Sequence, residues 1–326
     1  MTLKADVKKA SLKFGLALGT LMSLSMAHGA WDDGTAFDRT KYANRETLPD
    51  FTAHMCDEPE AQPTLTLIKD NLYRHTNGKG LATHSGLVMI TKEGALVVDS
   101  GATCSAPWLE AEIKKRFNVP IKYVVLTHAH ADHIAGAEIW QKHGAIVVAN
   151  QRAVEPIIGE KLPYALPDKI FDKDMTIKLG DEVVQLHRVE PSHSNSMTMV
   201  LFPRQKALQC TDVCQNKTMP YNDFLDFYYD GWIETLDWVI AQDVDVIDVG
   251  HYGLSNREQQ VALRRYMVDL HQQVTDLTRQ GMSWDQLYRN VKFSPEVQSW
   301  TNFNNMKTLN VLGMHRWVTN HRRGNW

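Results

Sequence analysis

Seven consecutive residues hold three imidazoles and one carboxylate, a density of metal-binding groups that chance composition rarely produces. They read Thr127-His128-Ala129-His130-Ala131-Asp132-His133. The β-branched, apolar run at 121–126 is typical of a buried strand, and residues 134–142 are typical of a helix. We therefore expect the cluster to lie on a strand-to-helix loop, where its side chains can converge on metal ions.

The spacing within this loop separates the side chains into two sets. Alternation along an extended backbone places His128 and His130 on one side, whereas Asp132 and its neighbour His133 point elsewhere. One loop can therefore serve two metals. The H-E-x-x-H helix of zinc proteases is absent from the sequence. The alternative is a structural role for each residue, such as Asp132 capping the following helix, but three histidines beside an aspartate favour a common cause.

Three more residues with metal-binding side chains follow predicted strands later in the chain. His193 stands in a small polar loop between two strands, Asp212 follows a third strand and His251 a fourth. These strands are predicted at residues 183–189, 197–202, 207–211 and 244–250. Each residue taken alone has a structural role more often than not. Taken with the cluster, they supply the additional ligands that a di-metal site needs.

The order of these residues resembles the metallo-β-lactamase superfamily, in which H-x-H-x-D-H is followed by His, Asp and His. The turn Asp99-Ser100-Gly101 after an apolar strand is similar to the D-x-G element of that family. The resemblance spans about residues 64–255. It implies an α/β fold of four layers, the αββα sandwich of the family.

The resemblance also implies that three residues hold one metal, three hold a second, and one bridges them. The first set is His128, His130 and His193, the second is Asp132, His133 and His251, and the bridge is Asp212. This is the glyoxalase II-like and lactonase-like ligand set, and the bridging aspartate counts against a dedicated β-lactamase. Asp132 would also act in catalysis by orienting the attacking hydroxide. Tyr252 follows the last ligand where the family commonly has glycine, so it is placed to alter the pocket wall.

Two metals would lower the pKa of a shared water from about 15.7 toward 7 and so supply hydroxide without a protein nucleophile. In agreement, the sequence has no G-x-S-x-G nucleophile elbow. We therefore expect a hydrolase that uses a metal-bridging hydroxide on a small molecule: an ester, thioester, lactone or related acyl substrate. Zinc is the expected metal, with two ions per chain, although the ligands also suit iron and manganese.

Three other functions stay open at this point. A mononuclear non-haem iron oxidoreductase of the persulfide dioxygenase type shares this fold and these ligand types. β-Lactamase or sulfatase activity could come from the same activated hydroxide. A binding module that kept the fold is the third alternative, and the intact ligands argue against it.

Residues 1–30 are typical of a secretory signal peptide, because lysines precede an apolar run that is too short to span a membrane as a mature helix. We therefore expect a periplasmic or secreted protein without a stable membrane anchor. Removing four lysines and one aspartate would take the formal net charge from −3 to about −6. A mildly acidic chain lacks the basic surface that nucleic acid requires.

Four cysteines, Cys56, Cys104, Cys210 and Cys214, allow three pairings. Cys210 and Cys214 flank Asp212, so they either form a disulfide that braces the site or leave one thiol as a buried neighbour. Export permits disulfides, but a chain of this size does not require them.

An aromatic-rich segment at 221–232 follows Asp212 and either walls an apolar substrate pocket or packs in the core. If it walls a pocket, Tyr221 and Phe224 contact the substrate, together with Tyr252.

The remaining organisation follows from periodicity and turn residues. We expect a polar, irregular extension at 31–63, the metal-binding domain at 64–255 and a helical appendage at 256–326. In the domain we expect strands at 65–73, 86–91 and 95–98 and a helix at 107–117. In the appendage we expect helices at 257–279, 283–290 and 300–316, the first of them capped by Ser255. Residues 310–317 look like the C-terminal tail of a secreted branch of the family and are expected to be a packing or homodimer element.

Overall fold

The computed structural model describes residues 30–52, 55, 63–77 and 84–321. Apart from its last residue, the predicted signal peptide lies outside this range. Among the described residues, the strands form two mixed sheets, with the orders β2-β9-β8-β7-β6-β5-β4-β3 and β1-β10-β11-β12-β13-β14-β15.

The strands and helices have the following bounds. The first sheet contains β2 (Thr35–Ala36), β3 (Thr64–Lys69), β4 (Leu72–Asn77), β5 (His84–Thr91), β6 (Gly94–Val98), β7 (Ile121–Leu126), β8 (Ile146–Asn150) and β9 (Lys169–Phe171). The second contains β1 (Trp31–Asp32), β10 (Asp174–Leu179), β11 (Glu182–Arg188), β12 (Thr198–Phe202), β13 (Ala207–Gln209), β14 (Val246–Asp248) and β15 (Leu254–Ser255). The helices are η1 (Arg39–Tyr42), α1 (Ser105–Phe117), α2 (Ala131–Ile134), α3 (Ala137–Lys142), α4 (Val154–Gly159), α5 (Tyr229–Ala241), α6 (Arg257–Arg279), α7 (Trp284–Asn290), α8 (Pro295–Gln298) and α9 (Phe303–Asn320).

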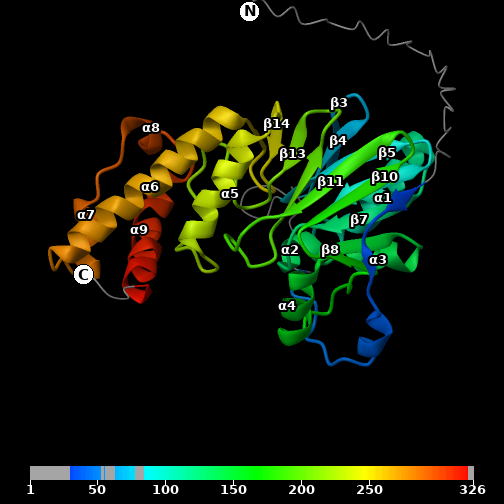
Figure 1. Cartoon of the computed structure of the whole chain (residues 1–326), viewed down its shortest axis with the longest axis horizontal. Helices are drawn as coiled ribbons and strands as arrows, with labels where there is room; N and C mark the ends of the chain where they lie inside the picture. Colours follow the sequence, from blue (N-terminus) through cyan, green and yellow to red (C-terminus); the bar gives the residue numbers. More distant parts are fainter. Residues whose placement is uncertain (1–29, 53–54, 56–62, 78–83, 322–326) are drawn as a thin grey trace, which may run out of the picture.

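Three buried apolar layers hold these elements together. Side chains such as Leu96 and Phe202 fill the space between the two sheets. Trp140 belongs to a second layer under α1 and α3, and Leu236 and Leu263 to a third, between the other sheet and α5 and α6. Helices therefore cover both outer faces of the sheet pair, as Figure 1 shows with α1 to α4 on one side and α5, α6 and α9 on the other. The predicted αββα sandwich is confirmed.

The strand-helix alternation on either side of the 128–133 cluster is also confirmed. β6, β7 and β8 pair in parallel, with α1 connecting the first two and α2 and α3 connecting the last two. Parallel strands buried on both faces are expected to be mostly apolar runs. β6 is buried along its whole length, and β7 is buried except at Lys122. The helix predicted at 134–142 is present as the shorter α3, at Ala137–Lys142. The separate α2 precedes it, so Asp132 and His133 lie in a helical turn rather than on the predicted loop.

The first predicted strand, at 65–73, is wrong as a single element. It is a hairpin of β3 and β4, in which Lys69 pairs with Leu72. Asp70 takes up a left-handed backbone (φ 52°), a conformation that aspartate tolerates better than most residues. The apolar alternation continues through this turn, so the periodicity alone does not mark the reversal.

The segment before β3 is less irregular than predicted. β1 pairs with β10 at the edge of one sheet, and β2 pairs with β9 at the edge of the other. The two short strands thus tie the N-terminal extension to both halves of the sandwich.

The helices after His251 form the predicted appendage, seen from yellow to red in Figure 1. The cap of α6 is Asn256, whose side chain accepts a hydrogen bond from Gln259 N at 3.1 Å, rather than Ser255. The Ser255 hydroxyl donates instead to Gln215 O at 2.8 Å. The last helix starts later than predicted, at Phe303, because the separate α8 precedes it. In the described part of the chain, no helix is both long and apolar enough to cross a membrane.

A buried ion pair joins the sheets beneath the loop that carries His251. Arg74 Nε donates to Asp248 Oδ2 at 2.9 Å, and the Asp248 side chain is fully buried. The other oxygen of Asp248 accepts hydrogen bonds from Ser85 Oγ and Gly250 N, at 2.7 and 3.0 Å. β14 therefore ends in a loop whose backbone is held by a charged group.

Replacing Arg74 with alanine should lower the free energy of unfolding by about 3 kcal/mol, because it leaves the Asp248 carboxylate buried without its partner. Denaturant unfolding measures this. Lys69→Ala is the control, since it removes an exposed partner of Asp245 and should cost less than about 1 kcal/mol. Equal losses in the two variants would show that the Arg74 pair does not carry this stability.

Candidate metal centre

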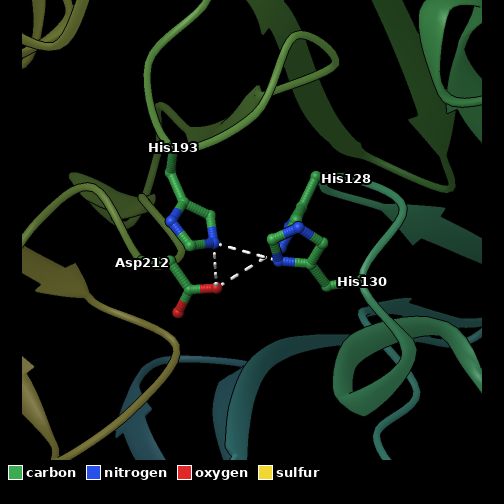
Figure 2. Close-up of side chains that lie close together, drawn as sticks. All are labelled: His128, His130, His193 and Asp212. Carbon is green, nitrogen blue, oxygen red and sulfur yellow. Dashed lines mark hydrogen bonds and ion pairs between the residues drawn. The ribbon is translucent and has the colours of Figure 1, made fainter. Parts of the chain in front are cut away.

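All seven residues predicted as metal ligands lie together at one end of the sheets. The loop after β7 carries His128 and His130, and the adjoining α2 carries the next two ligands, Asp132 and His133. The β11–β12 loop carries His193, and Asp212 and His251 follow β13 and β14, which pair in parallel. Parallel strands place their carboxyl ends at the same edge, so the side chains that follow them meet there. Figure 2 shows His193 and Asp212 facing His128 and His130 from the other sheet.

The first set of ligand atoms surrounds a small common volume. His193 Nε2 lies 3.0 Å from His130 Nδ1 and 3.3 Å from Asp212 Oδ2. His128 Nε2 lies 3.3 Å from the same carboxylate oxygen. One ligand atom from each of these four residues lies within 4.8 Å of every other, which is the geometry expected of a metal site.

The second set, Asp132, His133 and His251, meets the same criterion. Asp132 Oδ2 lies 3.3 Å from His133 Nε2 and 3.4 Å from His251 Nε2. Asp212 also contacts this set, with Oδ2 3.1 Å from His133 Nε2 and Oδ1 3.2 Å from His251 Nε2. Its carboxylate thus lies between the two groups, as a bridging ligand would.

The buried nitrogens of the site fit a metal ion better than they fit the protein alone. Within the described part of the chain, His128 Nε2 and His133 Nε2 are buried and have no well-aligned hydrogen-bond partner, although both lie close to Asp212. An unpaired buried polar atom is costly unless something binds it. Imidazole and carboxylate are ligands of zinc, iron and manganese.

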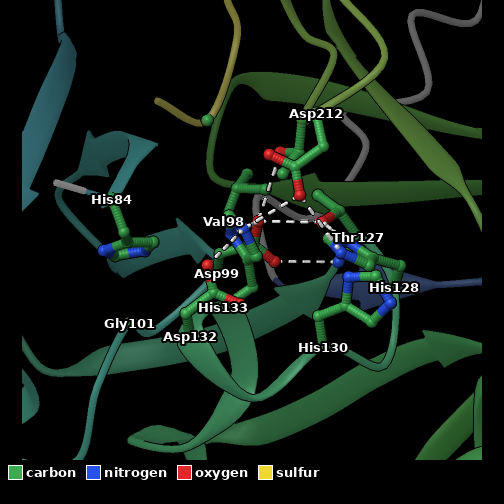
Figure 3. A network of polar contacts seen from close by, with 12 residues as sticks. His84, Val98, Asp99, Gly101, Thr127, His128, His130, Asp132, His133 and Asp212 are labelled. Atoms are coloured by element: carbon green, nitrogen blue, oxygen red, sulfur yellow. Dashed lines mark hydrogen bonds and ion pairs between the residues drawn. The ribbon is translucent and has the colours of Figure 1, made fainter. Parts of the chain in front are cut away.

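A chain of hydrogen bonds sets which nitrogen of His128 faces the site (Figure 3). Asp99 accepts hydrogen bonds from Thr127 N and Thr127 Oγ1, at 2.9 and 2.8 Å. The hydroxyl proton is used in this way, so Thr127 Oγ1 accepts from His128 Nδ1 at 3.0 Å. Nε2 then carries the lone pair that points into the site. Asp99 Oδ2 also lies 3.3 Å from His133 Nδ1.

Asp226 is a site residue that the sequence does not reveal. Its Oδ2 lies 3.1 Å from His130 Nε2, which leaves Nδ1 of that imidazole facing the first set. It stands in the aromatic segment with no recognisable spacing from the ligands. Its role becomes visible only in the folded structure, where the segment that carries Asp226 lies against His130.

The carboxylates and imidazoles of the site shift one another's pKa values against the effect of burial. Burial would raise the pKa of Asp212, but His133 and His251 hold it well below its usual range. Burial would lower the pKa of His251, yet Asp212 and Asp132 raise it to about 10. Burial keeps the pKa of His128 well below its usual value. The lowered pKa favours the neutral imidazole at His128, which is the form that binds a metal.

Local backbone constraints fix the bridging carboxylate. Asp212 has a left-handed backbone (φ 62°), and its N–H donates to Val249 O at 3.0 Å. Of the two alternatives for Cys210 and Cys214, the structure has the disulfide, which closes the loop around Asp212. Cys104 is disulfide-bonded as well. Gly250 (φ 82°) passes so close to Thr211 that a Cβ there would lie 2.7 Å from its methyl carbon.

A cavity of about 340 Å³ opens onto the seven-residue centre. Tyr221, Phe224 and Tyr252, predicted to contact substrate, all line it. Apart from the candidate metal ligands, the cavity is also lined by Met55, Gln215, Asn222, Leu225, Asp226 and Trp232. None of the described residues that line this cavity is a lysine or arginine. The aromatic segment thus both lines the cavity and packs in the core, where Phe224 and Phe227 are buried.

Asp226→Ala should weaken zinc binding about 10- to 100-fold, because His130 loses the partner that fixes its tautomer and ring orientation. Competition with a chromophoric chelator measures the affinity. Asp243→Ala, which removes an exposed partner of Lys206, is the control and should bind zinc like the parent protein. Unchanged affinity in the Asp226 variant would rule out this role.

The family model described as the metallo-beta-lactamase superfamily matches residues 78–251. Among curated proteins, the chain is 28% identical to a metallo-beta-lactamase type 2 of Elizabethkingia meningoseptica, over 43% of this chain and 58% of the relative. It is 24% identical to a linear primary-alkylsulfatase of Pseudomonas sp. (strain ATCC 19151), over 64% of this chain and 50% of the relative. These two matches thus span about half of each relative.

A solved structure of a metallo-beta-lactamase from Pontibacter korlensis superposes with a TM-score of 0.58 at 22% identity. The superposition covers 63% of this chain and 99% of the other, so it supports the sandwich fold. The family match covers more than half of the sequence and includes every residue of the seven-residue centre. The chain therefore belongs to the metallo-beta-lactamase superfamily.

Proposed function

We propose that this protein is a periplasmic, binuclear zinc hydrolase of neutral esters, lactones or thioesters that carry an apolar acyl group. The observation that carries the proposal is the position of the Asp212 carboxylate. It contacts both sets of ligand atoms and lines a largely apolar cavity. The metal-dependent hydrolase class also agrees with the relatives described above.

In the proposed site, His128, His130 and His193 would hold one zinc ion and Asp132, His133 and His251 the other, with the carboxylate of Asp212 close to both sets. The metals would supply a water-derived nucleophile at neutral pH and polarise the substrate carbonyl. Asp132 also lines the cavity, so its carboxylate can accept a proton from a water there and orient that water. Thr127 and Asp226 keep the ligand nitrogens directed inward.

The lining of the cavity favours an uncharged substrate. β-Lactams carry a carboxylate and alkyl sulfates a sulfate, and recognition of such anions usually relies on arginine or lysine. The described lining offers neither, and it places Asp226 on the wall. Met55, Tyr221, Phe224, Leu225 and Trp232 instead supply an apolar surface. β-Lactamase and sulfatase activities are therefore disfavoured as the main function.

The arrangement of the second set argues against a single-iron oxidoreductase. One metal in the first set would leave the buried His133 Nε2 without a partner of good geometry. Two metals satisfy both sets at once.

A periplasmic location agrees with two features. Residues 1–30 have the composition of a signal peptide. The disulfide between Cys210 and Cys214 is of a kind that persists in oxidising compartments.

The purified, mature protein should contain about two equivalents of zinc and hydrolyse p-nitrophenyl butyrate or an acyl lactone at least about 100-fold faster than a β-lactam or an alkyl sulfate. Elemental analysis and a substrate panel test this together. One equivalent of iron with no esterase activity would favour the oxidoreductase instead.

Asp212→Ala should reduce bound zinc and lower turnover by more than about 100-fold, since even residues outside the ligand set cost 10- to 100-fold. Metal content and kcat are measured on the same preparation, with Asp243→Ala as control. Full zinc occupancy with full activity in the Asp212 variant would contradict the bridging assignment.

Tyr221→Ala should raise KM for an apolar ester about three- to tenfold and leave zinc content unchanged, because the ring contributes apolar surface but no ligand atom. Trp284→Ala is a matched control: Trp284 is 59% exposed and Tyr221 60%, but Trp284 lies on α7. A loss of zinc in the Tyr221 variant would be inconsistent with this role.

A further inference from the structure

The cavity wall is built by a loop that the C-terminal helices hold in place. We call residues 217–226, between β13 and α5, the wall loop. It carries Tyr221, Phe224 and Leu225 at the cavity and Asp226 at His130. It lies within the family match, whereas α9 lies entirely outside residues 78–251.

The start of the wall loop pairs with the segment that leads into α9. Thr218 and Thr301 form a parallel β-bridge. Thr301 N donates to Lys217 O at 2.8 Å, and Met219 N donates to Thr301 O at 3.0 Å. The loop is thus anchored to the C-terminal region before it reaches the cavity.

The middle of the loop is held by a buried amide. Asn310, fully buried on α9, donates from Nδ2 to Pro220 O at 2.9 Å and to Asn222 O at 2.7 Å. Its Oδ1 accepts a hydrogen bond from Tyr266 on α6 at 2.8 Å. All three bonds require an amide in this orientation, so the contact is specific rather than a general packing contact.

One turn further along α9, Gly313 allows the helix to touch the loop backbone. A Cβ at this position would lie 2.1 Å from Asp223 O and 2.8 Å from a ring carbon of Phe224. Any residue other than glycine at this position would displace the loop.

Arg316, another turn on, closes the contact. Its guanidinium donates to Asp223 Oδ2 at 2.7 Å, to Asp223 O at 2.6 Å and to Phe224 O at 3.0 Å. Asn310, Gly313 and Arg316 are spaced by three residues, which places them on one face of a helix.

The loop needs such support because its backbone is unfavourable by itself. Asn222 and Phe224 both have left-handed backbones, with φ of 56° and 55°. This conformation is disfavoured for phenylalanine in particular and persists only where the surroundings impose it. Asn310 and Arg316 bind the carbonyls of these two residues and those of Pro220 and Asp223.

We propose that the Asn310–Gly313–Arg316 face of α9 is a specificity-determining element, which positions the wall loop and so selects substrates by the length of their apolar acyl chain. The inference rests on the proposed function, because it concerns the same cavity. The three residues are positioning residues, since none of them carries a ligand atom of the centre.

The test uses the full mature protein with zinc bound and compares p-nitrophenyl acetate with p-nitrophenyl octanoate. In Arg316→Ala, KM for the octanoate should rise about tenfold and KM for the acetate less than about twofold, with zinc content unchanged. Arg316→Lys should restore part of the difference, because an ammonium can bind the carboxylate but cannot reach all three acceptors in a fork. Arg264→Ala is the control: Arg264 binds Asp237 with two bonds between α6 and α5, and its loss should change neither KM.

Amide hydrogen exchange supplies a readout that needs no substrate. Exchange of residues 219–226 should become about tenfold faster in Arg316→Ala and stay unchanged in Arg264→Ala. Equal changes in KM for the two esters, or unchanged exchange in Arg316→Ala, would overturn the inference. If the parent protein hydrolyses neither ester, the proposed function and the acyl-length selectivity both fail, and faster exchange would still support the hold of α9 on the loop.

Discussion

The carboxylate of Asp212 is the group on which the arrangement of the centre depends. Its two oxygens lie within 3.3 Å of ring nitrogens from four histidines, and these histidines come from three separate loops. Bringing so many polar groups out of water is unfavourable unless their charges and lone pairs are satisfied together. A bound cation pair would satisfy them, and Asp212 is the residue that can belong to both halves of such a pair.

Side chains that surround the candidate ligands explain why the ligand-bearing segments adopt the required shape. Asp99 and Thr127 set the tautomer of His128, Asp226 does the same for His130, and Asp248 holds the backbone before His251. Three of these four residues carry carboxylates whose hydrogen bonds orient neighbours rather than bind a metal. Side chains that are held in this way lose little freedom when a ligand binds, which favours a well-ordered site.

Residues that are close in sequence, or that end strongly apolar strands, could be predicted. The cluster at 128–133 and the later candidate ligands follow from spacing and strand order, and the αββα layering follows from the family resemblance that these residues carry. The sequence leaves the disulfide around Asp212 as one of two alternatives. Asp226 and Arg74 could not be identified, because each meets its partner only through tertiary folding and neither has a fixed spacing from it. The hairpin at Asp70 was missed because a left-handed turn does not interrupt an apolar alternation. The role of α9 depends on Gly313, whose importance lies in an approach distance that composition does not encode.

The two N-terminal strands have a consequence for how the chain completes its fold. Trp31 pairs with Lys178 and Thr35 with Ile170, so these two strands, the first in the described part of the chain, have no partners until β9 and β10 have emerged. Until then the outer strands of both sheets expose unpaired N–H and C=O groups. Closure of the sandwich is thus a late, long-range event, and intermolecular pairing competes with it for as long as those edges stay open.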